Sequence, residues 1–344
     1  MLDRSPLAQL TLWRIREFTR EPEALFWVFA FPIVLAFALG LAFKNRAPET
    51  VQVAVEEGLG GPELAESLDA SDRIEAILLD SAEAALRLRT GRVALVVTPG
   101  QPATFTFDST RTESLVARLT VDDVIQETRG RRDVAEIREV PITEPGARYI
   151  DFLIPGLLGL NIMGTGMWGV GFGIVKTRTR KLLKRLLASP MRRSEYLLSY
   201  VCARLVWLAF EVGAVLLFGK LVFDVPIRGS LLSLAAVVLL GAATFSGIGL
   251  LVASRSRTIE GVSGLMNFVM VPMWIGSGVF FAYSNFPEAV QPFLKVLPLT
   301  ALNDALRAVL LDGAPLAATA GLLGIMLFWA VSSYAVALKI FRWD

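Results

Sequence analysis

The sequence predicts an α-helical polytopic membrane protein that carries a small α/β domain outside the membrane. Its 344 residues are 54% hydrophobic, and the mean hydropathy of +0.55 is too high for an ordinary soluble protein. Six apolar runs are long enough to cross a bilayer. Residues 44–148, between the first and second of these runs, have instead the mixed composition of a soluble domain.

The N-terminal residues 1–21 are expected to form a cytoplasmic interfacial helix, because arginines such as Arg14 and Arg16 alternate with large apolar side chains. The first transmembrane helix is predicted over residues 22–43, long enough to cross roughly 30 Å of hydrocarbon. A cleaved signal peptide is the alternative. We rank it lower, because the apolar run exceeds a typical signal core and no clean A-x-A site follows.

Residues 44–148 are predicted to fold as an extracytoplasmic α/β domain. The pattern β-α-β-α-β-β-α rests on buried runs, an alternating run and amphipathic runs. Three of the four expected strands are placed at 51–55, 93–97 and 104–107, and the expected helices at 62–68, 81–88 and about 113–129.

Residues 149–344 are predicted to form a five-helix transmembrane region. The spans are expected at about Phe152–Val175, Tyr196–Phe223, Ser230–Ala253, Gly261–Phe281 and Leu316–Leu338. Glycines in the first of these spans, including the G-x-x-x-G step from Gly169 to Gly173, indicate close helix contacts. Residues 283–312 are apolar but interrupted by prolines, and we expect two short helices dipping into the outer leaflet.

A basic loop at residues 176–194 fixes the expected orientation. It contains eight Lys and Arg residues and no Asp or Glu, and short loops of this kind stay in the cytoplasm. Both termini are then cytoplasmic in a multi-pass protein of the cell (inner) membrane. Within the loop, leucines and basic residues fall on opposite faces of a helix that Pro190 ends. This helix could lie on anionic headgroups or dock a soluble partner.

Composition excludes several classes of function. The chain has no His and one Cys, Cys202, so neither a zinc cluster nor an internal disulfide is expected. The segment Gly213–Lys220 has the wrong spacing for a phosphate-binding loop and lies inside a span. We therefore expect no catalytic residue, metal or cofactor on this chain. Its net charge of +2 gives no nucleic-acid-binding face.

Glu211 is predicted in the middle of a span, where a charge costs about 2.5 kcal/mol or more on insertion scales. Arg204, two turns away on the same helical face, is one candidate partner, and Lys220 is another. Glu211 therefore faces either a cavity on the substrate path or a structural partner. Asn161 and Asn267 are weaker candidates for the path, and interhelical hydrogen bonds are their alternative use.

Three stretches make the chain resemble the permease subunits of type-2 ATP-binding cassette (ABC) exporters, in the subfamily with a large extracytoplasmic domain between the first two spans. They are Arg185–Val201 (RLLASPMRRSEYLLSYV), Ser277–Arg307 (SGVFFAYSNFPEAVQPFLKVLPLTALNDALR) and Val53–Leu68 (VAVEEGLGGPELAESL). One departure is the pair Glu56 and Glu57, where the family often has an Asp-rich turn.

The resemblance implies that this chain pairs with a second permease chain, the same or related, and with ABC-type ATPase subunits that bind ATP and Mg. The basic loop would be the coupling helix, and residues 1–21 the connecting helix on the lipid bilayer. The resemblance assigns ATPase coupling to Arg185, Leu186, Leu187, Ala188, Ser189 and Pro190. It assigns an outer re-entrant gate to Ser277, Gly278, Phe281, Pro287, Pro298, Asp304 and Arg307.

The predicted function is therefore export of an amphiphilic or lipid-like substrate, as in multidrug or lipid efflux, by a homodimer or heterodimer with separate ATPases. A membrane-embedded enzyme, or a sensor that binds ligand with its extracytoplasmic domain, is the rival from another class. A channel is a third option, which the lack of a filter motif disfavours.

Overall fold

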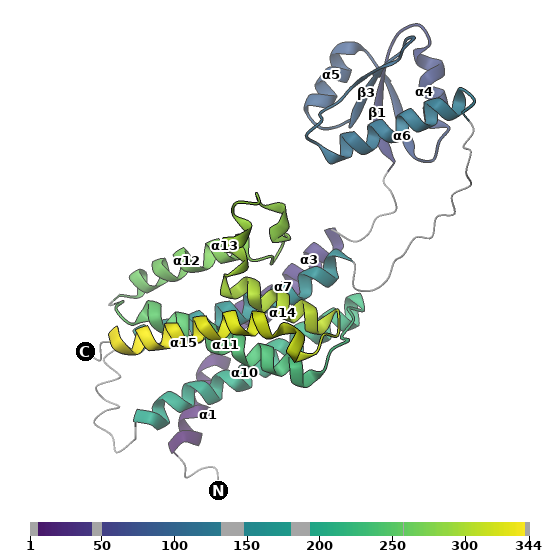
Figure 1. Cartoon of the computed structure of the whole chain (residues 1–344). Coiled ribbons are helices and arrows are strands. Elements are labelled where there is room, and N and C mark those ends of the chain that lie inside the picture. The colour runs from purple at the N-terminus through teal and green to yellow at the C-terminus, as the bar shows by residue number, and fades with distance from the viewer. Residues whose placement is uncertain (1–5, 43–49, 132–147, 180–192, 257, 341–344) are drawn as a thin grey trace. The chain divides into compact units, whose positions relative to one another are not determined.

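The computed structural model describes residues 6–42, 50–131, 148–179, 193–256 and 258–340. It divides into two compact units, shown in Figure 1. One unit comprises residues 45–141, and the other comprises residues 1–44 and 142–344.

The first unit is a small α/β domain built on one sheet. Its strands are β1 (Val51–Glu56), β2 (Ile74–Leu79), β3 (Leu95–Thr98) and β4 (Thr104–Thr106), and its helices are α4 (Gly61–Asp69), α5 (Ser81–Arg89) and α6 (Thr112–Thr128). The strand order is β2-β1-β3-β4. The first three of these strands are parallel, and β4 runs antiparallel to β3. The predicted β-α-β-α-β-β-α pattern is confirmed.

Side chains alternate between the two faces of this sheet, as the period of an extended strand requires. Val53 and Val55 of β1 enter a core with α4 and α6, whereas Ala54 between them enters a smaller core with α5. Helix α5 begins at a local cap, in which Asp80 Oδ1 accepts a 2.8 Å hydrogen bond from the Glu83 backbone N–H. One nine-residue helix therefore faces the side of the sheet opposite α4 and α6.

The second unit is helical. Its elements are α1 (Pro6–Thr19), α2 (Pro22–Leu25), η2 (Phe26–Ala30), α3 (Phe31–Ala42), α7 (Tyr149–Met167), η3 (Trp168–Phe172), α8 (Gly173–Thr179), α10 (Arg193–Phe223), α11 (Leu231–Ala253), α12 (Ile259–Gly276), η4 (Tyr283–Asn285), α13 (Gln291–Lys295), α14 (Pro298–Leu310), η5 (Leu316–Thr319) and α15 (Ala320–Ile340).

Six helical stretches of the described residues are long and apolar enough to cross a membrane, which confirms the predicted α-helical polytopic class. They are Pro22–Ala42, Tyr149–Lys176, Val201–Phe223, Leu231–Ala253, Ile259–Gly276 and Leu316–Ile340. The first two contain the π-helical turns η2 and η3. Such turns occur often at functional sites.

Local contacts explain where several spans begin and end. Helix α7 starts where Asp151, fully buried in its first turn, accepts hydrogen bonds from the Arg148 backbone and guanidinium. The same contact raises the pKa of Arg148 above its ordinary value. Helix α12 ends at Gly276, so the prediction that this span continues to Phe281 is wrong. The chain turns at Gly278, whose φ of +69° favours glycine.

Helix α11 is the centre of the membrane unit, packed against α7, α14 and α15. Close approach depends on glycine: a Cβ at Gly166 would lie 2.9 Å from Phe245 Cβ, and one at Gly249 would lie 2.8 Å from Met167 Cα. At Gly169 no other element of the described chain lies within 4 Å of the Cβ position, so this chain makes no close contact there. Gly166 and Gly171 of the second span meet α11, whereas Gly156 meets Val279 and Gly159 meets Asn303.

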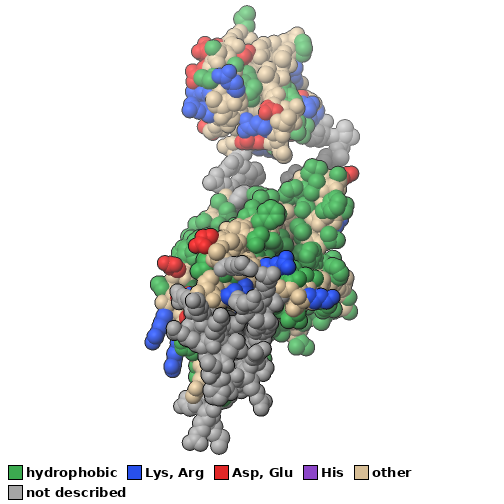
Figure 2. Space-filling model, turned by 90° about the vertical axis from the view of Figure 1, so that its left-hand side faces the viewer, with side chains coloured by type: hydrophobic (Ala, Val, Ile, Leu, Met, Phe, Trp, Pro, Cys, Tyr) green, Lys and Arg blue, Asp and Glu red, His purple; other side chains and the backbone are tan. Residues whose placement is uncertain are grey.

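The two units differ in surface chemistry. On the face shown in Figure 2, hydrophobic side chains cover much of the membrane unit, while Lys, Arg, Asp and Glu are scattered over the α/β domain. Phe268, on α12, is 77% exposed and Phe328, on α15, is 69% exposed. This is the surface expected of helices that meet lipid.

Candidate functional site

A buried ion pair lies inside the span formed by α10. Arg204 donates a 2.7 Å hydrogen bond from Nη1 to Glu211 Oε1. The side chains are 14% and 2% exposed, respectively. Residues seven apart lie two turns apart on one face of a helix, and the long arginine side chain closes that gap. The predicted Arg204–Glu211 pair is confirmed.

Thr165 of α7 joins this pair to a second helix. Its hydroxyl accepts a 2.6 Å hydrogen bond from Arg204 Nη2. The same hydroxyl lies 2.7 Å from the Asn161 carbonyl oxygen and 3.1 Å from Glu211 Oε2, and its one proton goes to one of these acceptors. Thr165 is 39 and 46 residues from its two partners. No local spacing rule in the sequence could have found it.

The cluster has hydrogen-bonding capacity left over. Arg204 Nε and the nearby Trp207 Nε1 are buried donors without a partner among the described residues. A buried donor that lacks an acceptor costs about 1–3 kcal/mol, so a polar group entering this region would be bound favourably. Trp207 also contacts Phe18 and Phe29, with ring centroids 4.5 Å and 6.0 Å apart. It thereby joins α10 to the N-terminal helices.

The side chains of the other polar candidates bind elsewhere or are exposed, and Asn161 meets the cluster only through its backbone carbonyl. Asn161 is buried and donates a 3.0 Å hydrogen bond from Nδ2 to the Val28 carbonyl in η2, which confirms the interhelical use. Asn267 is exposed on α12. Lys220 donates a 2.5 Å hydrogen bond to Asp224 Oδ1, one turn further on, so the alternative pairing with Glu211 is wrong. The flexible Lys220 side chain, near the end of α10, pairs with Asp224 because that carboxylate is only one turn away.

The 283–312 segment is held against the second span by Arg307. The guanidinium of Arg307 donates to the carbonyls of Gly278 and Phe152, and its carbon lies 3.7 Å from the centroid of the Phe152 ring. Asp304 also accepts a hydrogen bond, 3.4 Å, from Nη1. The structure therefore brings three of the predicted gate residues, Gly278, Asp304 and Arg307, into one cluster.

A second contact fixes the start of the same segment. Asn303 of α14 donates a 2.9 Å hydrogen bond from Nδ2 to the carbonyl of Ser277. Both residues are fully buried, and Pro298 is buried at the beginning of α14. Phe281 and Pro287, also predicted for the gate, are instead exposed. Helix α14 packs against α7, α11 and α15, so protein covers the broken backbone.

The six coupling residues from Arg185 to Pro190 lie outside the described residues, and their assignment stays a prediction. The helix that leads towards them is described. Lys176, on α8, donates a 2.9 Å hydrogen bond to Glu21, just after α1. Arg178 donates at 3.2 Å to the carbonyl of Ala253, the last residue of α11, and at 2.9 Å to that of Ser256, three residues further on.

The N-terminal helix α1 also packs on α10. Arg14, 9% exposed, donates a 2.9 Å hydrogen bond from Nε to Ser199 Oγ. An arginine in an amphipathic helix gives no sign, in the sequence alone, that it points into the protein. Lys176, Arg178, Asn303 and Phe152 were missed for the same reason, since each finds its partner on a distant element.

Six apolar helices around a buried polar cluster, with a broken helical segment packed against them, define a multi-pass membrane protein of the transporter type. The profile of the family described as "ABC-2 family transporter protein" matches residues 22–339. The chain belongs to this family and is a type-2 permease, the transmembrane subunit.

Curated relatives are similar to this chain over part of its length. The linearmycin resistance permease protein LnrN of Bacillus subtilis is 28% identical over 178 residues, which are 51% of this chain and 46% of that protein. The inner membrane transport permease YadH of Escherichia coli is 25% identical over 203 residues, 57% of this chain and 76% of that protein. ABC transporter G family member 20 of Dictyostelium discoideum is 27% identical over 169 residues, 49% of this chain and 23% of that protein. The chain thus matches less than half the length of two of these relatives.

Proposed function

We propose that this chain is the permease subunit of an ATP-driven exporter that moves an amphiphilic or lipid-like substrate out of the cytoplasm or the inner leaflet. The observation that carries the proposal is the family match over residues 22–339, which includes all six spans. ATP and Mg are bound by separate ATPase subunits, and a second permease chain, the same or related, completes the pathway. The chain lies in the inner membrane, with both termini in the cytoplasm.

In this proposal the cluster of Arg204, Glu211 and Thr165 lies beside the substrate path. Ionisable groups inside a membrane are costly, and those that persist mark pathways more often than surfaces. The leftover donors on Arg204 and Trp207 support this role, because a structural ion pair alone does not require them. A passing substrate with a carbonyl, hydroxyl or ether oxygen would supply the hydrogen-bond acceptor that these two donors lack.

The 283–312 segment is the proposed outer gate. Arg307 and Asn303 tie it to the carbonyls of Phe152, Gly278 and Ser277. Side chains bonded to backbone carbonyls hold one position of a segment without fixing it covalently, so the segment can move when α7 moves. Opening of the exit would break these contacts together.

The proposed path of coupling starts at the loop 176–194 and passes through α8. An ATPase subunit docked on Arg185–Pro190 would pull on α8, which is linked to the N-terminal helix by Lys176 and to α11 by Arg178. Two spans and the N-terminal helix would then respond to one displacement. These links favour a loop that transmits movement of the ATPase through α8 over a loop that only binds lipid headgroups by its charge.

The proposed substrate class rests on the apolar character of the spans and on the names of two relatives. One is described as a linearmycin resistance permease and another as a probable multidrug ABC transporter permease. Few charges occur in the spans of this chain. Amphiphiles suit such a pathway better than ions do.

The test is transport in inverted membrane vesicles that contain this chain and its ATPase partner, over a panel of lipids and amphiphilic drugs. We expect ATP-dependent accumulation of at least one amphiphile and none without the ATPase. A chain that is stable and active without any nucleotide-hydrolysing partner would contradict the proposal.

A further inference from the structure

A pocket opens in the α/β domain, separate from the membrane unit. Its volume is about 610 Å³, in the range of pockets that hold small organic molecules. Helix α5 is short, and the part of its sheet face formed by β3 and β4 stays open beside it. Val96 and Thr106, paired across these two strands, line this opening.

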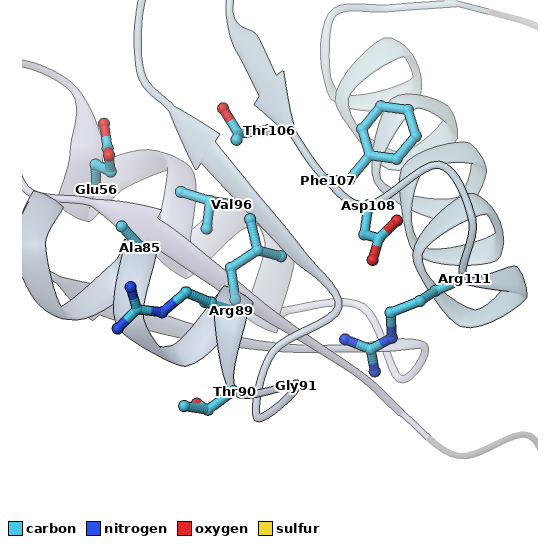
Figure 3. A pocket seen from close by; sticks show the side chains of 11 residues that line it. Glu56, Ala85, Arg89, Thr90, Gly91, Val96, Thr106, Phe107, Asp108 and Arg111 are labelled. Carbon is cyan, nitrogen blue, oxygen red and sulfur yellow. The ribbon is translucent and has the colours of Figure 1, made fainter.

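The pocket combines an apolar part with two arginines. Val96, Leu88 and Ala85 supply the apolar surface. Arg89, at the end of α5, and Arg111, just before α6, belong to different parts of its lining, and the Arg89 side chain points away from Arg111 (Figure 3).

The acidic side chains of the pocket are engaged within the domain. Glu56 accepts hydrogen bonds from Ser81 Oγ at 3.0 Å and from Thr98 Oγ1 at 2.8 Å, so each carboxylate oxygen has a partner within the domain. Asp108 Oδ1 accepts from the hydroxyl and the backbone N–H of Thr110, at 2.7 Å and 2.9 Å. These two bonds, the hydroxyl first, hold the pKa of Asp108 below its ordinary value.

The arginines keep donors for a ligand. Arg89 is exposed and has no hydrogen-bond or ion-pair partner among the described residues. Arg111 uses Nη2 on Glu113 at 3.0 Å, and its guanidinium has further N–H groups. Gly91 leaves space for Arg111: its φ is +73°, and a Cβ there would lie 3.3 Å from Arg111 Nη1. Donors outnumber free acceptors, so a ligand must bring acceptor oxygens.

From this arrangement we propose that the pocket binds a small organic anion, a carboxylate or a phosphate monoester carried on a short apolar body. The anionic group pairs with a guanidinium, which matches carboxylate and phosphate oxygens. The apolar body covers Val96 and Leu88. This inference does not depend on the proposed transport function, since binding is measured without an ATPase.

The experiment titrates the full chain, in nanodiscs of neutral phosphatidylcholine, with 4-fluorophenyl phosphate followed by fluorine NMR. We expect saturable binding with a Kd of about 1 mM or tighter, and weakening by about tenfold in Arg89→Gln or in Arg111→Gln, whichever guanidinium holds the anion, as for loss of one charge-assisted hydrogen bond. Arg92→Gln is the matched control: Arg92 is exposed three residues beyond α5 but does not line the pocket, and this variant should bind as the wild type does.

Two further probes test the chemistry. The neutral 4-fluorobenzyl alcohol and the cationic 4-fluorobenzylamine should bind at least tenfold more weakly, roughly the contribution of the lost charge-assisted contact. Equal binding of either probe, unchanged binding in both arginine variants, or no binding at about 10 mM overturns the proposal. Because Arg89 and Arg111 lie at the surface of the domain, these variants should fold, and circular dichroism checks it.

The same titration separates two sources of the anion. In nanodiscs that contain phosphatidylglycerol, competition would raise the apparent Kd and identify a lipid headgroup as the natural ligand. An unchanged Kd would identify a soluble anion. Both results uphold the site, and the arginine variants decide whether it exists.

Discussion

Glu211 accepts a 2.7 Å hydrogen bond from Arg204 within one membrane-spanning helix, and Thr165 of a second helix contacts both. Removing one charge of a buried pair leaves the other uncompensated, which costs about 3 kcal/mol or more. We expect Glu211→Gln to lower the free energy of unfolding by about that amount and to reduce the transport rate. Thermal unfolding in detergent and vesicle transport measure the two effects.

A double variant distinguishes the proposed path from a purely structural pair. Replacing both charges, as in Arg204→Met with Glu211→Leu, removes the desolvation cost along with the attraction, and stability should return close to that of the wild type. If the pair serves the path, transport stays low in this stable protein. Full transport would show that the pair is structural. Asp224→Asn, on an exposed ion pair beyond the same helix, is the control and should leave transport unchanged.

The second prediction concerns the contact of Arg307 with Phe152. Lysine keeps the charge but cannot reach two carbonyls while lying over the ring. Arg307→Lys should therefore lower the free energy of unfolding by about 2 kcal/mol, from a lost hydrogen bond and a weaker cation–π contact. Asp304→Asn should cost less, because Arg307 keeps its hydrogen bonds to the Phe152 and Gly278 carbonyls in that variant. Equal losses in the two variants would contradict this ranking.

The sequence was informative wherever a rule acts along one element. The six spans, the buried strand at residues 51–55 and the Arg204–Glu211 pair all follow from the length of apolar runs or from the helix period. Each of these predictions is confirmed. The chain turn at Gly278, by contrast, ends α12 early, and an apolar run continuing to Phe281 concealed it.

Contacts between elements could not be predicted in the same way. Thr165, Asn303 and Ser199 acquire their partners only when distant helices pack, and nothing near them in the sequence signals it. The glycine step shows the same limit. The spacing from Gly169 to Gly173 is a known contact pattern, yet the direction from which α11 packs decides which glycines are used.

The third prediction concerns Gly156 of the second span, which meets the chain just after α12 and not α11. A Cβ at Gly156 would lie 2.5 Å from the Val279 carbonyl oxygen and 3.1 Å from Val279 Cα, so backbone has to move. Gly156→Ala should lower the free energy of unfolding by about 2 kcal/mol, as overpacking does. Gly169→Ala, on the same span, meets nothing within 4 Å and should cost far less. Thermal unfolding of the two variants, side by side, measures the difference.

The fourth prediction concerns the contact of Lys176 with Glu21. Their side chains are 26% and 48% exposed, so the pair should contribute less than about 1 kcal/mol to stability. We propose that the pair passes movement of α8 to the N-terminal helix, because it joins α8 to the chain just after α1. Lys176→Glu should leave folding intact and reduce the stimulation of the partner ATPase by substrate.

Charge exchange provides the control for this pair. Adding Glu21→Lys to Lys176→Glu restores an opposite-charge pair in reverse order, and stimulation should recover in part. Glu17, 3.9 Å from Lys176, is the weaker contact, and Glu17→Gln should have little effect. Stimulation that stays low after the exchange would mean that Lys176 acts through something other than Glu21.

The fifth prediction separates the two faces of the amphipathic helix predicted in the loop 176–194. If the leucine face seats in the ATPase, Leu186→Asp and Leu187→Asp place a charge in an apolar contact, and co-purification of the ATPase should be lost. If the basic face binds headgroups instead, Lys181→Gln and Lys184→Gln should reduce transport more than the leucine variants do. We expect the leucine variants to fail and the lysine variants to keep both the ATPase and transport.

Insertion of the spans into the membrane also depends on the basic residues of the loop, so only two lysines are replaced. Removing two of eight basic residues leaves enough positive charge to keep the loop in the cytoplasm, so topology should not change. A loss of ATPase binding in the lysine variants could then not be attributed to inverted spans. Cysteine labelling of the loop from each side of the membrane checks the topology in every variant. Retained ATPase binding in both leucine variants would remove this loop from the coupling path, and the link from α8 to Glu21 would lose its proposed role with it.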